Sequence, residues 1–141
     1  MTLYIDTTSA ESVTLALSKQ SVLILSKKFK AKYRQSEKLL PQIDKLLRQG
    51  KSGLKKISGI IVVKGPGPFT ATRIGVATAN ALAFGLSIPV VGIKNTKFKN
   101  LEEMIKQGSE QLKKKNIRDI IEPFYDSEPN ITKPKSINLA S

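Results

Sequence analysis

Two short apolar segments flank a helical segment in the middle of the chain, and this arrangement constrains the fold more than any other feature. Residues 57–64 and 88–93 are runs of apolar residues that predict buried strands. Residues 69–86, rich in Ala, Gly and Thr, predict a helix between them. Two strands joined by a helical crossover pair in parallel. The region therefore predicts a layered α/β fold.

The start of the chain predicts three further strands, the second of which alternates apolar and polar residues with a period of two. These strands are expected at 2–6, 12–18 and 21–29. Their short connections favour an antiparallel meander. A helix is expected over 36–50, with Ser36 as its N-cap and Gly50 at its end. The order β-β-β-α-β-α-β predicts a mixed five-stranded sheet with flanking helices, as in ribonuclease-H-like folds and the first lobe of actin-like ATPases.

A loop rich in glycine and proline connects the strand at 57–64 to the helix at 69–86. It consists of Gly65, Pro66, Gly67 and Pro68. The pattern fits neither a Walker phosphate loop nor a dinucleotide fingerprint. Its two prolines also lack the N–H groups that a phosphate-binding loop uses as donors. We expect a rigid structural turn, in which the two glycines adopt unusual dihedral angles and the prolines fix the rest.

The helix expected at 69–86 carries one charged residue, Arg73, and is otherwise apolar on nearly every side. Small residues recur at every fourth position, at Ala71, Gly75, Ala79 and Ala83. A neighbouring, bulkier stripe holds Ile74, Thr78, Leu82 and Leu86. The small residues are compatible with close packing on the chain's own sheet or with a partner helix. The lack of a polar face favours the partner helix.

The composition limits the chemistry available to the chain. It contains 24 Lys and Arg against 11 Asp and Glu, a formal net charge of +13, and neither His nor Cys. Disulfides and thiolate metal sites are therefore excluded, and the commonest general base is absent. The positive charge allows contact with RNA or another polyanion, although Lys predominates over Arg, which is better suited to reading bases.

The acidic residues do not predict a metal site. Asp6 ends the first strand, where ribonuclease-H-like nucleases hold a metal, but the strand at 57–64 ends in Lys64 and Gly65 without an acid. Asp44 is expected on the solvated face of its helix. A two-metal nuclease is therefore disfavoured. We predict no catalytic residue, no metal and no cofactor.

One uncharged segment, 74–93, is long enough to cross a bilayer. Pro89 divides it, and its small residues gain little in lipid, so a buried helix followed by a buried strand is expected. The N-terminus does not have the pattern of a signal peptide. We expect a cytoplasmic protein without membrane contact.

The character of the sequence changes after Ile93. We expect a ribonuclease-H-like lobe over 1–93, a Lys-rich and partly helical segment over 94–119, and an extended tail over 120–141. The tail is expected to pack through Ile121, Phe124 and Tyr125.

Several motifs resemble the TsaB family, also called YeaZ. They are "YIDTT", "SEKLLPQID", "GPGPFTATRIGVATANALA", "IPVVGI" and, near the end, "EPFYDSEPNITKPK". The chain departs from the family pattern at Gln35, Pro68, Ala71 and Thr72. Between Ile93 and Ile121 it has a short Lys-rich segment where family members usually carry a second actin-like lobe. The resemblance implies a shortened form of the family fold.

The resemblance also implies a function. Members of the family are non-catalytic partners of TsaD, which forms threonylcarbamoyladenosine on tRNA with the help of the ATPase TsaE. The chain would contact tRNA indirectly through that complex and would form a homodimer when alone. Carried over residue by residue, the partner interface comprises Ser36, Leu40, Ile43, Leu47, Ala71, Ile74, Gly75, Thr78, Ala79 and Leu82. Two alternatives stay open: a basic RNA-binding module that acts alone, and a glycoprotease-like enzyme.

Overall fold

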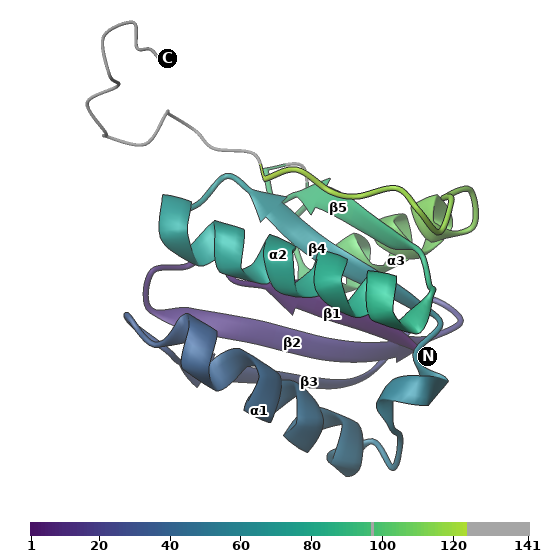
Figure 1. Ribbon diagram of the computed structural model, residues 1–141, viewed down its shortest axis with the longest axis horizontal. Helices are drawn as coiled ribbons and strands as arrows, with labels where there is room; N and C mark the ends of the chain where they lie inside the picture. Colours follow the sequence, from purple (N-terminus) through teal and green to yellow (C-terminus); the bar gives the residue numbers. More distant parts are fainter. Residues whose placement is uncertain (97, 124–141) are drawn as a thin grey trace, which may run out of the picture.

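A mixed five-stranded sheet forms the centre of the molecule (Figure 1), seen in a computed structural model that describes residues 1–96 and 98–123. The strand order is β3-β2-β1-β4-β5. The strands are β1 (Thr2–Asp6), β2 (Ser12–Lys19), β3 (Val22–Lys30), β4 (Gly59–Gly65) and β5 (Val90–Lys94). The antiparallel pairing of β1 with β2 and of β2 with β3 confirms the predicted meander. The parallel pairing of β1 with β4 and of β4 with β5 confirms the predicted crossovers.

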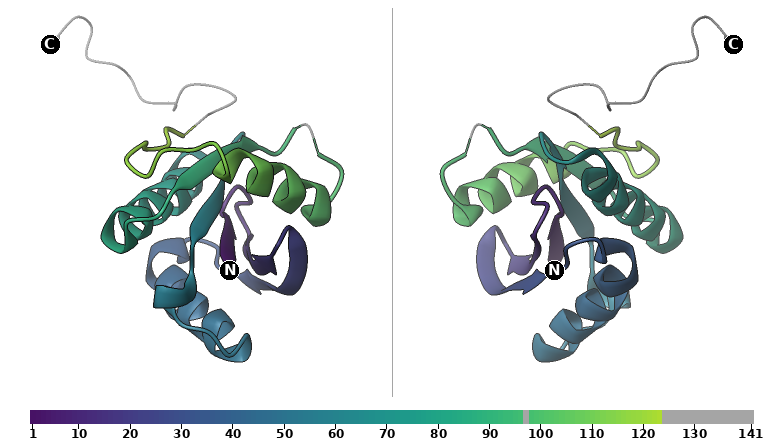
Figure 2. Two further views of the ribbon diagram at one scale, coloured as in Figure 1. Left: turned by 90° about the vertical axis from the view of Figure 1, so that its right-hand side faces the viewer. Right: turned by 90° about the vertical axis from the view of Figure 1, so that its left-hand side faces the viewer.

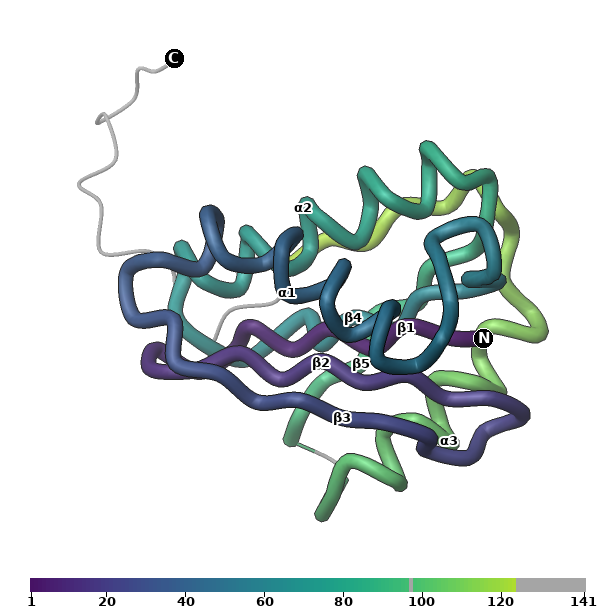
Figure 3. The backbone as a smooth tube through the Cα atoms, turned by 90° about the horizontal axis from the view of Figure 1, so that it is seen from below, coloured from purple at the N-terminus to yellow at the C-terminus, as the bar shows by residue number. Residues whose placement is uncertain are grey.

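Three α-helices cover the sheet within the described residues, and Figures 2 and 3 show two of them on one face and one on the other. They are α1 (Gln35–Gln49), α2 (Phe69–Leu86) and α3 (Leu101–Leu112). A short 3₁₀ helix, η1 (Leu54–Lys56), leads into β4. Helices α1 and α2 share one face of the sheet, while α3 covers the other. The predicted α/β class, element order and helix flanks are therefore confirmed.

The central strand β1 supplies side chains to two separate cores. Leu3 and Ile5 belong to the core beneath α1 and α2, whereas Tyr4 belongs to the core beneath α3. Successive residues of a strand point to opposite faces, so a strand covered on both sides is apolar throughout. Met104 and Ile105 close the second core from α3. The charged segment after Ile93 contains a helix, α3, with one buried face, because that face covers this second core.

The ends of α1 differ in part from expectation. The helix begins at Gln35, so Ser36 lies inside the first turn and is not the N-cap. Arg34 holds the N-cap position without a side-chain cap, and its Nε donates to Glu37 Oε1 at 3.0 Å. Gly50 is the C-cap, as predicted.

After α3 the chain returns across the molecule beside α2 and β5. Ile121 is buried in the core beneath α1 and α2. This confirms the predicted packing of Ile121, while Phe124 and Tyr125 lie outside the described residues. The division into 1–93, 94–119 and 120–141 stays a prediction. None of the described helices has the length and apolar character that crossing a membrane requires.

Candidate functional site

The loop between β4 and α2 lies against the turn after β1 and is bonded to Asn95. Gly65 has a φ of 127°, a region that favours glycine, and the Gly65–Pro66 peptide is cis. Gly67 does not have positive φ, so the expectation of an unusual dihedral there is wrong. Position 67 requires glycine because the backbone of Thr8 lies too close for a side chain. A Cβ added to Gly67 would be 2.7 Å from the backbone oxygen of Thr8.

A small hydrogen-bond network joins this loop to the turn after β1. Asp6 Oδ1 accepts from the backbone N–H of Thr8 at 2.9 Å and from Thr8 Oγ1 at 2.6 Å. Asn95 Nδ2 donates to Thr8 Oγ1 and to the carbonyl of Pro66, both at 3.0 Å. Asp6 thus organises the turn. Among the described residues, no three acidic, histidine or cysteine side chains gather where they could hold a metal.

Tyr4 lies on the α3 side of this network. Its hydroxyl is 3.5 Å from Asp6 Oδ2 and 3.4 Å from Met104 Sδ. Burial raises the pKa of Tyr4 far above its ordinary value, and the neighbouring negative charge of Asp6 raises it further. The hydroxyl therefore stays neutral and serves as a buried donor.

The small-residue stripe of α2 faces the chain's own fold. Thr7 Oγ1 donates to the carbonyl of Ala71 at 2.6 Å, and a Cβ added to Gly75 would lie 2.9 Å from Thr7 Cγ2. Ala71 and Ala79 are 4% and 0% exposed. The expectation that these three α2 residues form a partner surface is therefore wrong, because all three are buried in the chain's own fold, with Thr7 packed against Ala71 and Gly75.

Helix α1 needs a similar correction. Ile43 and Leu47 are each 2% exposed and belong to the core beneath the helices. They cannot contact a partner directly. By contrast, Ser36 is exposed, and Leu40 has 54% of its surface exposed. Helical spacing places Leu40 with Ile43 and Leu47, but Leu40 lies at the edge of the core face, where the structure leaves it exposed.

Only part of the predicted interface faces outward on the two helices. We call it the α1–α2 surface and define it as Ser36, Leu40, Ile74, Thr78 and Leu82, the predicted interface residues that are exposed or half-buried. Ile74 and Leu82 each pack partly against the core. They present the rest of their surface outward.

A groove of about 350 Å³ lies where α1 and α2 begin. Its lining includes Tyr33, Ser36, Pro68, Thr70 and Ile74. Tyr33, which is 88% exposed, was missed by sequence reasoning because it lies in the turn before α1, outside any periodic segment. The structure therefore brings Ser36, Pro68 and Ile74 together and adds Tyr33 beside them.

Residues 29–113 match the sequence model of a protein family described as "TsaD: tRNA N6-adenosine threonylcarbamoyltransferase". The matched region runs from the end of β3 past α3. It contains both α1 and α2, and therefore the whole α1–α2 surface.

Similar proteins carry the description "tRNA threonylcarbamoyladenosine biosynthesis protein TsaB". The one from Bacillus subtilis is 28% identical over 127 residues, which are 90% of this chain and 51% of the relative. The one from Buchnera aphidicola is 37% identical over 86 residues, 61% of this chain and 40% of the relative. A solved structure of YeaZ from Pseudomonas aeruginosa superposes with a TM-score of 0.61 at 30% identity. It matches 66% of this chain and 43% of its own. The chain thus spans about half or less of the length of these relatives.

Proposed function

The chain belongs to the TsaB/YeaZ family, and we propose that it acts in threonylcarbamoyladenosine synthesis on tRNA as a non-catalytic subunit that pairs with TsaD. The names of its relatives support the pathway. The partner, the non-catalytic role and a cytoplasmic location are our inferences for this chain.

The observation that carries the proposal is the α1–α2 surface. Leu40 is a large apolar residue that is more than half exposed on a well-formed helix, and Ile74 and Leu82 extend the apolar area across α2. Such an area, on rigid elements whose other faces are fixed in the core, suits a helix-against-helix interface. Exposed charged residues of α1 border it, among them Glu37, Asp44 and Arg48, as the polar rim of an interface would.

The residues at the carboxyl end of β1 support a role without catalysis. Asp6 is engaged by both donors of Thr8, and Thr8 is in turn held by Asn95. These groups fasten the turn to the loop at Pro66 and so fix the start of α2, where the α1–α2 surface begins. In this proposal, Asp6, Thr8 and Asn95 serve to hold the start of α2 in place for the interface.

In the proposed assembly, TsaD carries out the transfer and TsaE assists, while tRNA is held through the complex. When TsaD is absent, the same α1–α2 surface pairs two copies of this chain. A twofold dimer of this kind uses the same patch on both subunits. Self-association and TsaD binding would then compete.

A reconstituted modification assay tests the proposal. TsaD and TsaE from the same organism, with tRNA and the threonylcarbamoyl donor, should form the modified nucleoside only when this chain is added. Co-purification of the chain with TsaD provides the matching binding result. Full modification without the chain, together with no TsaD binding, would sink the proposal.

A further inference from the structure

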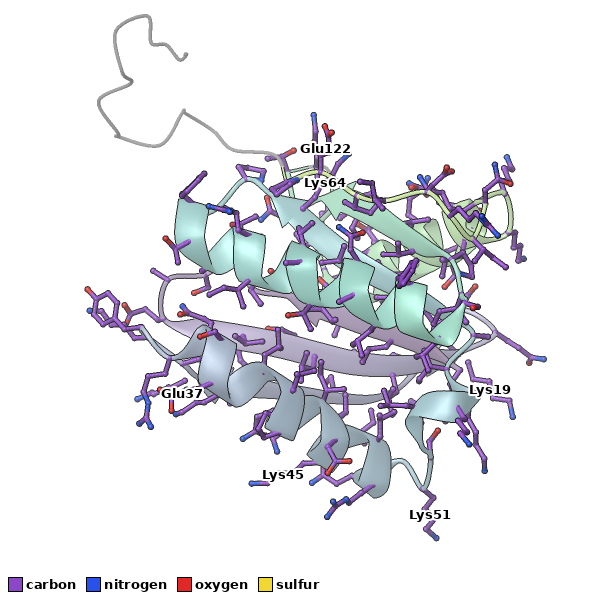
Figure 4. All side chains as sticks on the ribbon, in the orientation of Figure 1. Lys19, Glu37, Lys45, Lys51, Lys64 and Glu122 are labelled. Carbon is purple, nitrogen blue, oxygen red and sulfur yellow. The ribbon has the colours of Figure 1, made fainter. Side chains whose placement is uncertain are left out.

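The two ends of the sheet differ in charge. At the end where β1, β4 and β5 begin, which faces the viewer in the left panel of Figure 2, a lysine ends β2 and basic residues follow α1 and α3. We call this region the basic end. It comprises Lys19, Lys51, Lys55, Lys56, Lys113, Lys114 and Arg118. Figure 4 shows Lys19 and Lys51 at this end and Glu37 at the opposite one.

Five acidic residues lie at the other end of the sheet, while Glu110 of α3 lines a hollow together with Lys113 and Lys114 of the basic end. Asp6 ends β1, Glu11 lies in the following turn, and Glu37 lies in the first turn of α1. Glu102 and Glu103 lie in the first turn of α3. At the basic end, Asp119 lies 3.8 Å from Lys115, so its charge is offset locally.

Some of the lysines offset the partial negative charge of helix ends, since Lys51 and Lys113 come just after α1 and α3. Lys55 and Lys56 do not follow an α-helix and are fully on the surface. A net positive surface therefore remains, of the kind that attracts a polyanion.

Two hollows open on this surface. One, of about 220 Å³, is lined by polar groups that include Gln20, Ser21, Ser58, Ser109 and Lys113. Ser109 is 9% exposed, and its buried hydroxyl has no hydrogen-bond partner within the described residues. Because that oxygen is itself buried, exposed polar groups of the hollow such as Gln20 are the ones that a ligand would contact directly.

The second hollow, of about 550 Å³, lies on the other side of the short link between α2 and β5. Its lining includes Asn80, Phe84, Ser87, Ile117 and Arg118. Phe84 is 87% exposed on the last turns of α2, and Arg118 and Asp119 both line the same hollow. An exposed aromatic ring on a basic surface can stack on an unpaired base.

We propose that the basic end binds RNA directly, with its lysines on backbone phosphates and Phe84 stacked on an unpaired base. Hydroxyl and amide groups of the smaller hollow supply hydrogen bonds to phosphate or ribose oxygens. This goes beyond the proposed pairing with TsaD, because it uses the ends of the helices and leaves the α1–α2 surface free. RNA is favoured over an acidic protein because phosphates suit the lysines and a base suits the ring.

Binding by the full chain alone, without TsaD, tests this inference. The probes are a fluorescently labelled tRNA transcript and a labelled single-stranded oligoribonucleotide, followed by anisotropy between about 50 and 200 mM salt. The test variant combines Lys55→Gln, Lys56→Gln, Lys113→Gln and Lys114→Gln. The matched control removes the same charge from exposed lysines elsewhere: Lys28→Gln, Lys30→Gln, Lys99→Gln and Lys106→Gln.

The test variant should bind both probes more weakly, and the slope of log affinity against log salt should become shallower by about 3, at about 0.7 for each phosphate that a lysine no longer neutralises. The control should keep most of the slope. Equal losses of affinity in the two variants would overturn a localised site. Binding to anionic phospholipid vesicles in place of either RNA would assign the surface to a membrane and also overturn it.

The ring is tested separately. Phe84→Ala should weaken oligoribonucleotide binding by about tenfold, while Tyr33→Ala, which removes an equally exposed ring at the opposite end, should not. Unchanged binding by Phe84→Ala would overturn the stacking role. Because TsaD is absent from every arm, these outcomes do not depend on whether the pairing proposal holds.

Discussion

Thr7 occupies the space that a side chain at position 75 would need. A Cβ added to Gly75 would lie 2.9 Å from Thr7 Cγ2, and Thr7 Oγ1 donates to the carbonyl of Ala71 one turn earlier. The turn after β1 is thereby held against the first half of α2. Gly75 is therefore a position of the chain's own core, and the outward side of α2 is left to its bulkier residues.

Gly75→Ala should lower the free energy of unfolding by about 1–3 kcal/mol, because Thr7 must move and its hydrogen bond must shift. Gly85 is a matched control in the same helix, since an added Cβ there meets no atom within 4 Å. Gly85→Ala should raise the free energy of unfolding by about 0.5–1 kcal/mol. Denaturant unfolding of both variants provides the measurement, and a Gly75→Ala variant at least as stable as the wild type would contradict this packing of Thr7 against α2.

Asn80 fastens the returning C-terminal segment to α2. Its side chain donates to the carbonyl of Ile121 and accepts from the N–H of the same residue, both at 2.9 Å. Asn80→Ala should free this segment locally and speed hydrogen exchange at the Ile121 amide by about thirtyfold, given about 1 kcal/mol for each of the two hydrogen bonds removed. Asn116→Ala, on the exposed turn after α3, should leave that amide unchanged. Unaltered exchange in Asn80→Ala would show that other contacts hold the segment.

The buried hydroxyl of Tyr4 should make the fold sensitive to alkali. Its pKa is raised in the folded state by burial and by Asp6, so the unfolded chain releases this proton at a lower pH than the folded chain does. The stability that Tyr4 contributes is complete below about pH 10 and falls by about 1.4 kcal/mol per pH unit above it. Unfolding measured across this alkaline range should show a shallower loss of stability for Tyr4→Phe. Tyr33→Phe, at an exposed position, should keep the wild-type slope.

Periodicity was enough to predict the sheet, the crossovers and the existence of α1 and α2, because each of these elements has a regular apolar pattern. Periodicity could not predict which side of α2 faces the sheet, because the helix is apolar on nearly every side. The contact that decides this comes from Thr7, a polar residue in the turn after β1. The same limit applies to Gly67, whose small size is required by the backbone of Thr8 across the loop.

On α1, helical spacing groups Leu40 with residues that the structure buries, and only the structure separates them. Leu39, Ile43, Leu46 and Leu47 form the regular apolar face and are buried, whereas Leu40 falls beside that face and is exposed. A single exposed apolar residue is common on a protein surface, so Leu40 indicates an interface only together with the apolar residues of α2. The ten interface positions taken from the family resemblance therefore fall into two groups. Some are buried in the chain's own fold, and others lie outward on the α1–α2 surface.

If the proposed function is right, TsaD binds to the α1–α2 surface. Leu40→Glu tests it most directly, because it places a charge in the middle of the surface at a residue that is 54% exposed. Leu54→Glu is the matched control, since Leu54 is 42% exposed on η1, away from that surface. Thermal unfolding should first show both variants folded.

The deciding measurement is the affinity of TsaD from the same organism for the wild type and these two variants. Leu40→Glu should weaken binding by at least about tenfold, or about 1.4 kcal/mol, while Leu54→Glu binds like the wild type. If folded Leu40→Glu binds TsaD as tightly as the wild type does, the α1–α2 surface is not the interface.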